Sequence, residues 1–454
     1  MRQTALANAL IILSVLVLGQ RTLGGALFDW GAWAGFVLLC LVGLASNTIR
    51  ETLLLLASLA LGAFLLWRGD GGASLAQAMD LAAFFAAFIL LLTGLKIAAD
   101  HSRAVLAVGR YLIRQPASGR YLATATGGHF LGVFLNFGAI SLMAPLIQNA
   151  ARDEAGVIDR PLERRQISAL LRGFAWILLW APTTLTQAVL LTLFTEFSYP
   201  RVIALGLATS VVMVGLGFFY DRAEWRHATP DTGQSPPFPR AEFGRLVVIC
   251  GTLILATAAL QLGLGQSTAL ALMFVAPSVT LIWFLSQRPP GRAMTAQLVA
   301  FWPALTSNAP GLARSAIALG LSGFIGRLLA EVVPAARLAA ELDLSAMPGW
   351  LFLALLPVAI TLGGQIALSP IILVVFIGQV IQTIPTLPAD PTHIVFALSA
   401  GWALSMFASP NATATLLISA TTKLPPTTLT WSWNLRYGLL CYGVLVAIFA
   451  LLEA

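Results

Sequence analysis

The chain has 454 residues, of which 58% are hydrophobic and only 10% are charged, and its formal net charge is +7. So much apolar sequence excludes a soluble domain and predicts an all-α protein that crosses a membrane many times. Most of its arginines lie in loops between apolar segments, where they set membrane orientation, so the positive charge does not indicate nucleic-acid binding.

The first hundred residues predict four ordinary membrane spans. We expect residues 1–20 to be a retained span outside the repeated part, because no small-residue cleavage pattern follows their apolar run. Apolar runs of about 20 residues, the length that a bilayer core requires, follow at 28–46, 50–67 and 80–98. Residues 100–114 carry arginines at helical spacing opposite apolar side chains, which predicts a helix lying in the membrane interface.

Residues 121–149 predict a re-entrant hairpin with its tip near Asn136. The segment is too long for one crossing, it is interrupted at Asn136-Phe-Gly138, and arginines flank it on both sides. A single crossing would leave one basic cluster outside the cytoplasm, whereas a hairpin keeps both inside. A segment of about 28 residues accommodates two half-depth helices of roughly 12 residues each.

A broken helix is predicted at 166–195 and again at 392–420. The first is interrupted at Ala181-Pro-Thr-Thr184 and the second at Ser409-Pro-Asn-Ala-Thr413, and Pro182 and Pro410 occupy equivalent positions. Each proline removes a backbone donor in the middle of a segment that is long enough to span the bilayer. Protein groups must satisfy the freed carbonyls, because lipid cannot.

The second half repeats the order of the first after a proline-rich cytoplasmic linker at 220–243. The other predicted elements are spans at 201–219, 244–262, 268–285 and 434–452, an apolar region at 297–333, a surface helix at about 335–346 and a second hairpin at 351–384 that is interrupted at Gly363-Gly-Gln365. Each half, 28–219 and 244–454, then holds five spans and one hairpin. Because five is odd, the halves enter from opposite sides and form an inverted repeat, with about 11 transmembrane helices in total.

Orientation follows from the basic residues. With the N-terminus in the cytoplasm, most of the 26 Lys and Arg residues fall in cytoplasmic segments, and we expect the protein in the plasma membrane, the inner membrane of a bacterium. Arg172 and Arg314 lie in apolar segments near predicted cytoplasmic ends, so we expect both to snorkel to the interface. His129, in the first hairpin, is expected to be a hydrogen-bonded packing residue rather than a proton relay.

The two hairpin tips and the two helix breaks are predicted to converge near the midplane of the membrane and to form the binding site. Half-helix N-termini suit the oxygens of an anion, while unwound carbonyls and hydroxyls suit a hard cation such as Na⁺. The candidate substrate-binding residues are Asn136, Phe137, Gly138, Thr183, Thr184, Gln365, Ser369, Ser409, Asn411 and Thr413. The candidate ion-binding residues are Asn136, Gly138, Pro182, Gly364, Pro410 and Asn411. Each has a purely structural alternative in capping, helix back-bonding or turn formation.

Enzyme chemistry is not predicted. The sequence offers no nucleophile and base pair, no phosphate-binding loop and no metal-ligand cluster, so no cofactor is expected. No Asp or Glu maps to the four breaks, which favours Na⁺ over H⁺ as the coupling ion by default.

The whole pattern resembles the ion transporter superfamily, and most closely the divalent anion/sodium symporters. The resemblance is architectural and covers nearly the whole chain: inverted repeats that each hold a re-entrant hairpin followed by a broken helix. Members carry Ser-Asn-Thr at both tips, whereas the tips here are Leu135-Asn-Phe-Gly138 and Gly364-Gln-Ile-Ala367, of which only Asn136 matches. The resemblance implies a homodimer of scaffold and transport domains that carries the site across the bilayer by an elevator-like step.

The sequence therefore predicts a secondary active transporter of a small anionic organic solute, coupled to Na⁺ rather than H⁺. Three alternatives stay open at this point. The chain could be the membrane subunit of a tripartite-type transporter that needs a separate binding protein, an exporter of an inorganic anion or oxyanion, or an integral-membrane enzyme or flippase for a lipid-linked substrate.

Overall fold

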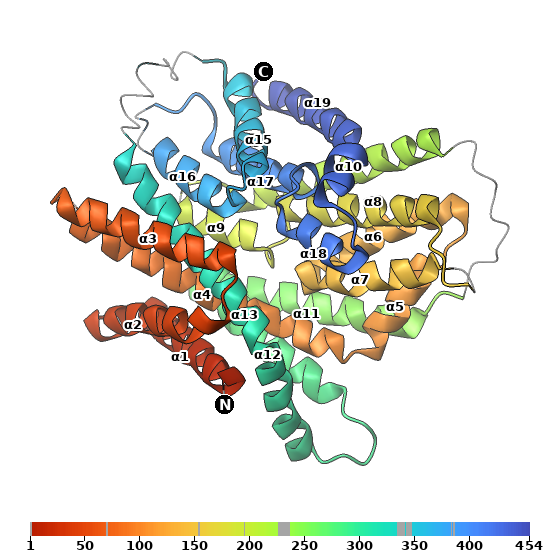
Figure 1. Cartoon of the computed structure of the whole chain (residues 1–454), viewed down its shortest axis with the longest axis horizontal. Helices are drawn as coiled ribbons and strands as arrows, with labels where there is room; N and C mark the ends of the chain where they lie inside the picture. Colours follow the sequence, from red (N-terminus) through yellow and green to blue (C-terminus); the bar gives the residue numbers. More distant parts are fainter. Residues whose placement is uncertain are drawn as a thin grey trace.

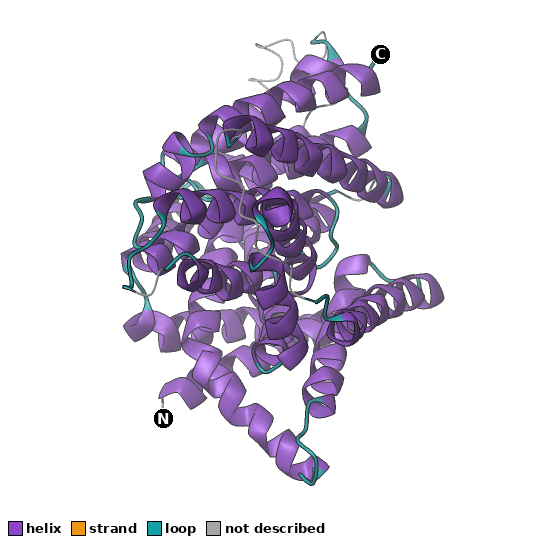
Figure 2. Cartoon of the chain, turned by 90° about the vertical axis from the view of Figure 1, so that its right-hand side faces the viewer, coloured by secondary structure: helices purple, strands orange, loops and turns teal. Residues whose placement is uncertain are grey.

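The computed structural model describes residues 2–69, 71–152, 155–194, 196–225, 237–333, 341, 347–382, 384 and 386–454. Within these residues the regular structure is helical and contains no β-strand (Figures 1 and 2), which confirms the predicted class. Ten of the described helical segments are long and apolar enough to cross a membrane. The predicted broken helix at 166–195 is not among them, because its break divides it into pieces that are each too short to count.

The chain begins with four long apolar helices that pack together. They are α1 (Arg2–Thr22), α2 (Ala26–Gly43), α3 (Ile49–Trp67) and α4 (Gly71–Asp100). Helix α1 packs on α2, α4 and α13 (Met294–Val332) because Leu6, Leu10, Leu13 and Val17 recur on one face, where all four are fully buried. The predicted extra first span is thus part of the helical core.

The predicted interfacial helix and first hairpin appear as three short helices. These are α5 (Arg103–Ile113), capped by the Ser102 side chain, α6 (Ala117–Leu135) and α7 (Phe137–Ala150). Helices α6 and α7 pack against each other and meet at Asn136. The turn of the chain therefore lies at the residue that the sequence marked as the tip, while its depth in a membrane stays a prediction.

The first broken helix consists of α8 (Arg160–Ala175), the 3-10 helix η2 (Trp176–Leu179) and α9 (Leu185–Leu193). Asp159 caps α8 through a hydrogen bond from the Leu162 amide. After it, α10 (Tyr199–Glu224) continues well past residue 219. The predicted linker at 220–243 is therefore helical at its start and again from Arg240; its central part, 226–236, lies outside the described residues.

The middle of the chain contains α11 (Arg240–Leu264), α12 (Thr268–Ser286) and α13. Helix α13 makes its most extensive contact with α4. A Cβ atom on Gly320 would lie only 2.8 Å from the carbonyl oxygen of Ala82, so a glycine is required for this close approach. The predicted surface helix at 335–346 falls almost entirely outside the described residues.

The C-terminal part repeats the element order of the first half. Its helices are α15 (Gly349–Gln365), α16 (Pro370–Gln382), α17 (Pro391–Ala408), α18 (Thr413–Thr422), the π-helical turn η4 (Thr428–Ser432) and α19 (Leu435–Leu452). The contacts repeat as well: α6 packs on α8 as α15 packs on α17, and α7 packs on α18 as α16 packs on α9 (Figure 1). The second arm of each predicted hairpin thus meets the broken helix of the other half. The opposite membrane orientation of the halves stays a prediction.

Candidate functional site

A cavity of about 420 Å³ lies where the first hairpin tip faces α3, α4 and α13. Helices α16 and α18 of the second half close it, so both halves of the chain contribute to its wall. Of the residues predicted to bind solute or ion, this wall contains Asn136, Phe137, Gly138, Thr183, Ser369 and Thr413. Asn136 and Thr413, which are far apart in sequence, therefore share one cavity.

Asn136 occupies the tip itself in an unusual backbone conformation. Its φ of 49° and ψ of −130° lie in a region that residues other than glycine rarely adopt, and such strain concentrates at functional positions. The backbone is satisfied at both ends, because the Asn136 amide donates to the Gly132 carbonyl at 2.8 Å and its carbonyl accepts from the Ala139 amide at 3.1 Å. The buried side-chain Oδ1 has no hydrogen-bond partner among the described residues. The tip thus presents a free acceptor beside the cavity.

The first helix break is tied to the same hairpin. The Thr183 hydroxyl donates to the Val133 carbonyl on α6, so this side chain lies on the cavity wall while it fixes the break against the hairpin. Thr184 is not on the wall: it accepts a hydrogen bond from the Gln187 amide at 3.5 Å as the N-cap of α9 and donates to the Ala181 carbonyl at 2.8 Å. Pro182, between them, is also off the wall. Thr184 and Pro182 shape the break rather than the cavity surface.

The second tip is closed by hydrogen bonds to the second break. Ser409 Oγ donates to the Gly364 carbonyl at 2.6 Å, and Asn411 Nδ2 donates to the Gly364 and Gln365 carbonyls at 3.1 and 3.2 Å. Gln365 Nε2 donates in return to the Ala408 carbonyl at 3.1 Å. Gly364, Gln365, Ser409, Pro410 and Asn411 do not line the cavity.

This closure bears on the expected ion site at the second tip. The Gly364 carbonyl oxygen accepts from two side chains and also from the Ala367 amide at 3.3 Å. A carbonyl oxygen has two lone pairs, so these donors compete directly with any cation. Asn136 Oδ1, the hydroxyls and the Glu51 carboxylate are oxygen ligands on the cavity wall. Within the described ranges no three His, Cys, Asp or Glu side chains are grouped as metal ligands.

Charged side chains on the cavity wall are predominantly positive. Arg50 from α3, Lys96 from α4 and Arg314 from α13 are on the wall, together with the carboxylate of Glu51. The stem of Lys96 lies against the tip, since a Cβ atom on Gly138 would be 3.0 Å from Lys96 Cγ. Among the described residues no salt bridge joins any of these four side chains to a partner. An anion is therefore the ligand that the charge of this cavity favours.

The expectation that Arg172 and Arg314 snorkel to the interface is wrong for Arg172. Its side chain is only 2% exposed; it donates to Asn434 Oδ1 at 2.7 Å and to the Trp433 carbonyl at 3.2 Å, and it lies over the Tyr437 ring at 4.5 Å. Hydrogen bonds and aromatic faces thus stabilise this charge inside the protein. Arg314 lies in the middle of α13 and exposes its side chain at the cavity rather than at a helix end.

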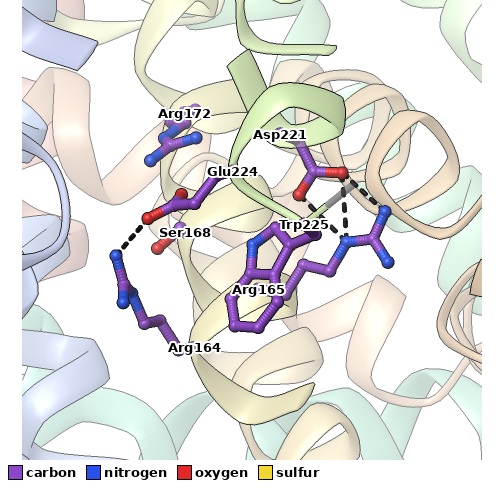
Figure 3. Close-up of a pocket in the computed structure, with 7 residues that line it drawn as sticks. All are labelled: Arg164, Arg165, Ser168, Arg172, Asp221, Glu224 and Trp225. Carbon is purple, nitrogen blue, oxygen red and sulfur yellow. Dashed lines mark hydrogen bonds and ion pairs between the residues drawn. The ribbon is translucent and has the colours of Figure 1, made fainter. Parts of the chain in front are cut away.

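A second charged cluster consists of ion pairs between α8 and α10 (Figure 3). Arg165 donates to both carboxylate oxygens of Asp221, at 3.0 and 2.6 Å, and Arg164 pairs with Glu224. The side chains fill the space between the helices, which leaves no volume for a ligand. We therefore assign these pairs to holding the two helices together.

His129 is a hydrogen-bonded packing residue, as predicted. One ring nitrogen is 3.0 Å from the Gly173 carbonyl, and the Trp180 indole donates to the other at 3.0 Å. Since Nε2 is the acceptor, Nδ1 carries the proton and donates to the carbonyl, and both nitrogens are occupied. This histidine joins the hairpin to the first broken helix.

Sequence reasoning missed Lys96, Arg50 and Glu51. Lys96 lies inside the apolar run 80–98, for which the sequence predicts an ordinary span, although a charge inside such a run is itself a signal of function. Thr48 followed by Glu51 has the spacing of a capping box, which indicates a helix start and not a cavity. Only the packing of α3 beside the tip shows that the same residues reach the site.

Comparison with known proteins places the fold among solved transporter structures. No protein-family model matches the sequence, and no curated protein matches it. The YdaH transporter of Alcanivorax borkumensis, described as having an unusual topology, is similar with a TM-score of 0.54 and 17% identity over 92% of this chain and 97% of that one. MtrF of Neisseria gonorrhoeae, described as illuminating a class of antimetabolite efflux pumps, has a TM-score of 0.54 and 16% identity over 88% of this chain and 93% of that one. At such identities the likeness concerns the fold alone, and the resemblance to divalent anion/sodium symporters stays a prediction.

Proposed function

We propose that this protein is a secondary active transporter of a small organic anion, coupled to a cation gradient. One observation carries the proposal: the cavity at the strained first tip has three cationic side chains, Arg50, Lys96 and Arg314, and one carboxylate, Glu51. A positively charged, low-dielectric cavity attracts an anion and strengthens its interactions once it has entered. The volume of about 420 Å³ suits a small organic molecule.

The predicted topology indicates that the cavity opens to the cytoplasm. With a cytoplasmic N-terminus, Arg50 and Lys96 lie at the cytoplasmic ends of the spans predicted at 50–67 and 80–98. Both side chains are on the cavity wall. The conformation described here is then the inward-facing one, in which the solute exchanges with the cytoplasm.

Na⁺ is our first candidate for the coupling ion, with Asn136 Oδ1 and the nearby hydroxyls as its ligands. Free oxygen acceptors are what a hard cation requires, and Asn136 Oδ1 is such an acceptor. A cation beside the three positive side chains would bind best once an anion is present, which is the mutual dependence that symport requires.

The transported unit would comprise the hairpins and broken helices, which pack on one another across the two halves. We propose that they move together by an elevator-like step within a homodimer, as the resemblance to divalent anion/sodium symporters implies. The similarity of the fold to the YdaH and MtrF structures supports membrane transport as the general function.

Reconstitution into liposomes tests the proposal. Labelled succinate and hexanoate, a dianion and an apolar monoanion, should enter vesicles that contain the protein by a saturable route, faster when a Na⁺ gradient is imposed. Vesicles that contain Arg314→Gln serve as the matched control, because only one cavity charge is lost. Flux that ignores every cation gradient would remove the coupling, and flux no faster than in protein-free vesicles would remove transport of these anions.

A further inference from the structure

Glu51 is the only carboxylate on the cavity wall among the described residues. It lies in the first turn of α3, and just 7% of its surface is exposed. A charged side chain is seldom this buried without a paired countercharge. No salt bridge to Glu51 is present within the described part of the chain.

The local structural role of Glu51 does not require its charge. The Thr48 amide donates to Glu51 Oε2 at 2.7 Å, as in a capping box at the start of α3. The Thr48 hydroxyl donates to the same oxygen. A glutamine performs this capping equally well, because one acceptor oxygen suffices. The second carboxylate oxygen, Oε1, takes part in neither of these bonds.

The charged groups around Glu51 come from every element that packs against α3 here. Helix α3 packs on α4, which brings Lys96 to the cavity wall, and on α13, which brings Arg314 there. Arg50 precedes Glu51 directly in the sequence and is on the same wall. An anion held by these three cations would occupy the same cavity as the Glu51 carboxylate. Two negative charges in one cavity of low dielectric constant repel each other.

We propose that Glu51 binds a proton when the solute anion enters the cavity, so that solute and proton move together. This proposal rests on the function proposed above and adds a proton to its coupling ions. In this step a hydronium ion of the solvent gives its proton to a carboxylate oxygen of Glu51: one O–H bond breaks in the hydronium ion, which becomes water, and one O–H bond forms on the carboxyl group. The bound anion removes the need for the Glu51 charge, because it neutralises the same three cations.

Linkage fixes the direction of the pH dependence. If a bound anion favours protonated Glu51, then protonated Glu51 favours the bound anion by the same factor. Anion affinity should therefore rise as the pH falls and level off once Glu51 is protonated. Couplings between two sites are typically of the order of tenfold, which is the change in affinity we expect.

A carboxylate on the cavity wall also changes the comparison of Na⁺ with H⁺ as the coupling ion. The four breaks contain no acidic residue, and this absence favoured Na⁺. Glu51 comes from a different helix and reaches the cavity by packing. A carboxylate is thus available for proton coupling, outside the segments in which one was sought.

Calorimetry on the purified full chain tests the proposal. Succinate and hexanoate are titrated into the protein in two buffers with different ionisation enthalpies, from about pH 5 to about pH 8, so that the difference in heat counts the protons taken up. We expect uptake approaching one proton per bound anion in the wild type. Glu51→Gln should bind the anions with almost no proton uptake and no pH dependence. Glu242→Gln, half-buried at the start of α11 and off the cavity wall, should behave like the wild type.

The outcomes separate the two proposals. Binding without proton uptake in the wild type overturns the role of Glu51 but leaves the anion site standing. Failure of both anions to bind overturns the anion site itself. Should Glu51→Gln not fold, infrared difference spectra of the wild type decide: a protonated carboxyl signal that appears on anion addition supports the proposal, and its absence overturns it. In that case Glu51→Asp must shift the signal, and an unshifted signal would assign the proton to another residue.

Discussion

The two hairpin tips occupy equivalent places in the repeat, yet their surroundings differ. At the first tip Asn136 has a positive φ, and its Oδ1, which lies beside the cavity, has no hydrogen-bond partner in the part of the chain that the structure describes. At the second tip Ser409 and Asn411 donate to the tip carbonyls, and the tip residues lie off the cavity wall. One tip therefore leaves polar groups free for a ligand, while the other uses them internally.

The difference shows that a repeated break does not by itself make a repeated site. Both breaks free backbone carbonyls, and in a membrane these must find donors within the protein or the ligand. The second half supplies such donors from its own Ser409 and Asn411, whereas the first break supplies Thr183, whose hydroxyl bonds to α6 instead of the tip. Four experiments test this difference between the two tips.

The largest effect is expected for Arg314→Gln. The substitution removes a positive charge from the cavity wall beside the first tip, which should cost about 2 kcal/mol of anion binding, or roughly 30-fold in affinity. Binding of succinate measured by calorimetry gives the value. Arg327→Gln is the matched control on the same helix, since Arg327 pairs with Glu331 at 2.6 Å away from the cavity wall. Equal losses in the two variants would contradict a site at the first tip.

Asn136→Gly should separate function from stability. Glycine adopts a positive φ without strain, so we expect the free energy of unfolding to rise by about 1 kcal/mol. Loss of the Oδ1 acceptor should weaken Na⁺ binding, and anion affinity should fall by the part that depends on Na⁺. Ala367→Gly makes the same relief at the second tip, where Ala367 has a φ of 64°. That variant should gain stability with unchanged affinity. Normal transport by Asn136→Gly would show that Asn136 only shapes the turn.

Ser409→Ala and Asn411→Ala test the closed tip. Each removes hydrogen bonds to the Gly364 carbonyl, which should destabilise the protein by about 1 kcal/mol per lost bond. Thermal unfolding in detergent measures the loss. Anion affinity should change little, because neither side chain is on the cavity wall. A fall in affinity as large as that of Arg314→Gln would place the second tip within the site.

The smallest effects are expected from adding a single methyl group at each tip. In Gly138→Ala the new Cβ would lie 3.0 Å from Lys96 Cγ, so the flexible lysine stem must move by a few tenths of an ångström. In Gly364→Ala it would lie 3.0 Å from Ser409 Cβ and Oγ and would strain the bond that closes the tip. We expect a modest loss of anion affinity in the first variant and of thermal stability in the second. The reverse pattern would contradict the assignment of the tips.

Local signals in the sequence predicted the helical class and the positions of the breaks. At the predicted breaks, prolines and small polar residues inside apolar segments mark the ends of helices, so α6 ends before Asn136 and α9 begins after Thr184. Proline alone is not sufficient, because Pro145 and Pro277 lie inside α7 and α12. The same signals identified six of the residues that line the cavity. They act through the neighbouring backbone, which makes them readable from the sequence.

The cations and the carboxylate of the cavity could not be found in this way. Arg50 and Glu51 stand at a helix end, where charges are ordinary, and only the packing of α3 and α4 beside the tip brings them to the cavity together with Lys96. The prediction for Arg172 was wrong for the same reason, because its hydrogen-bond partners Trp433 and Asn434 come from the opposite end of the sequence. Long-range packing decides which charges meet, and no local pattern encodes it.

A structure determined with a bound anion would show which of the two tips holds the ligand. Electron cryomicroscopy of the protein saturated with succinate or hexanoate should show the carboxylate within hydrogen-bonding distance of Arg314 or Lys96, next to Asn136. Density at the second tip, between Gln365 and Asn411, with an empty cavity at the first would contradict the account.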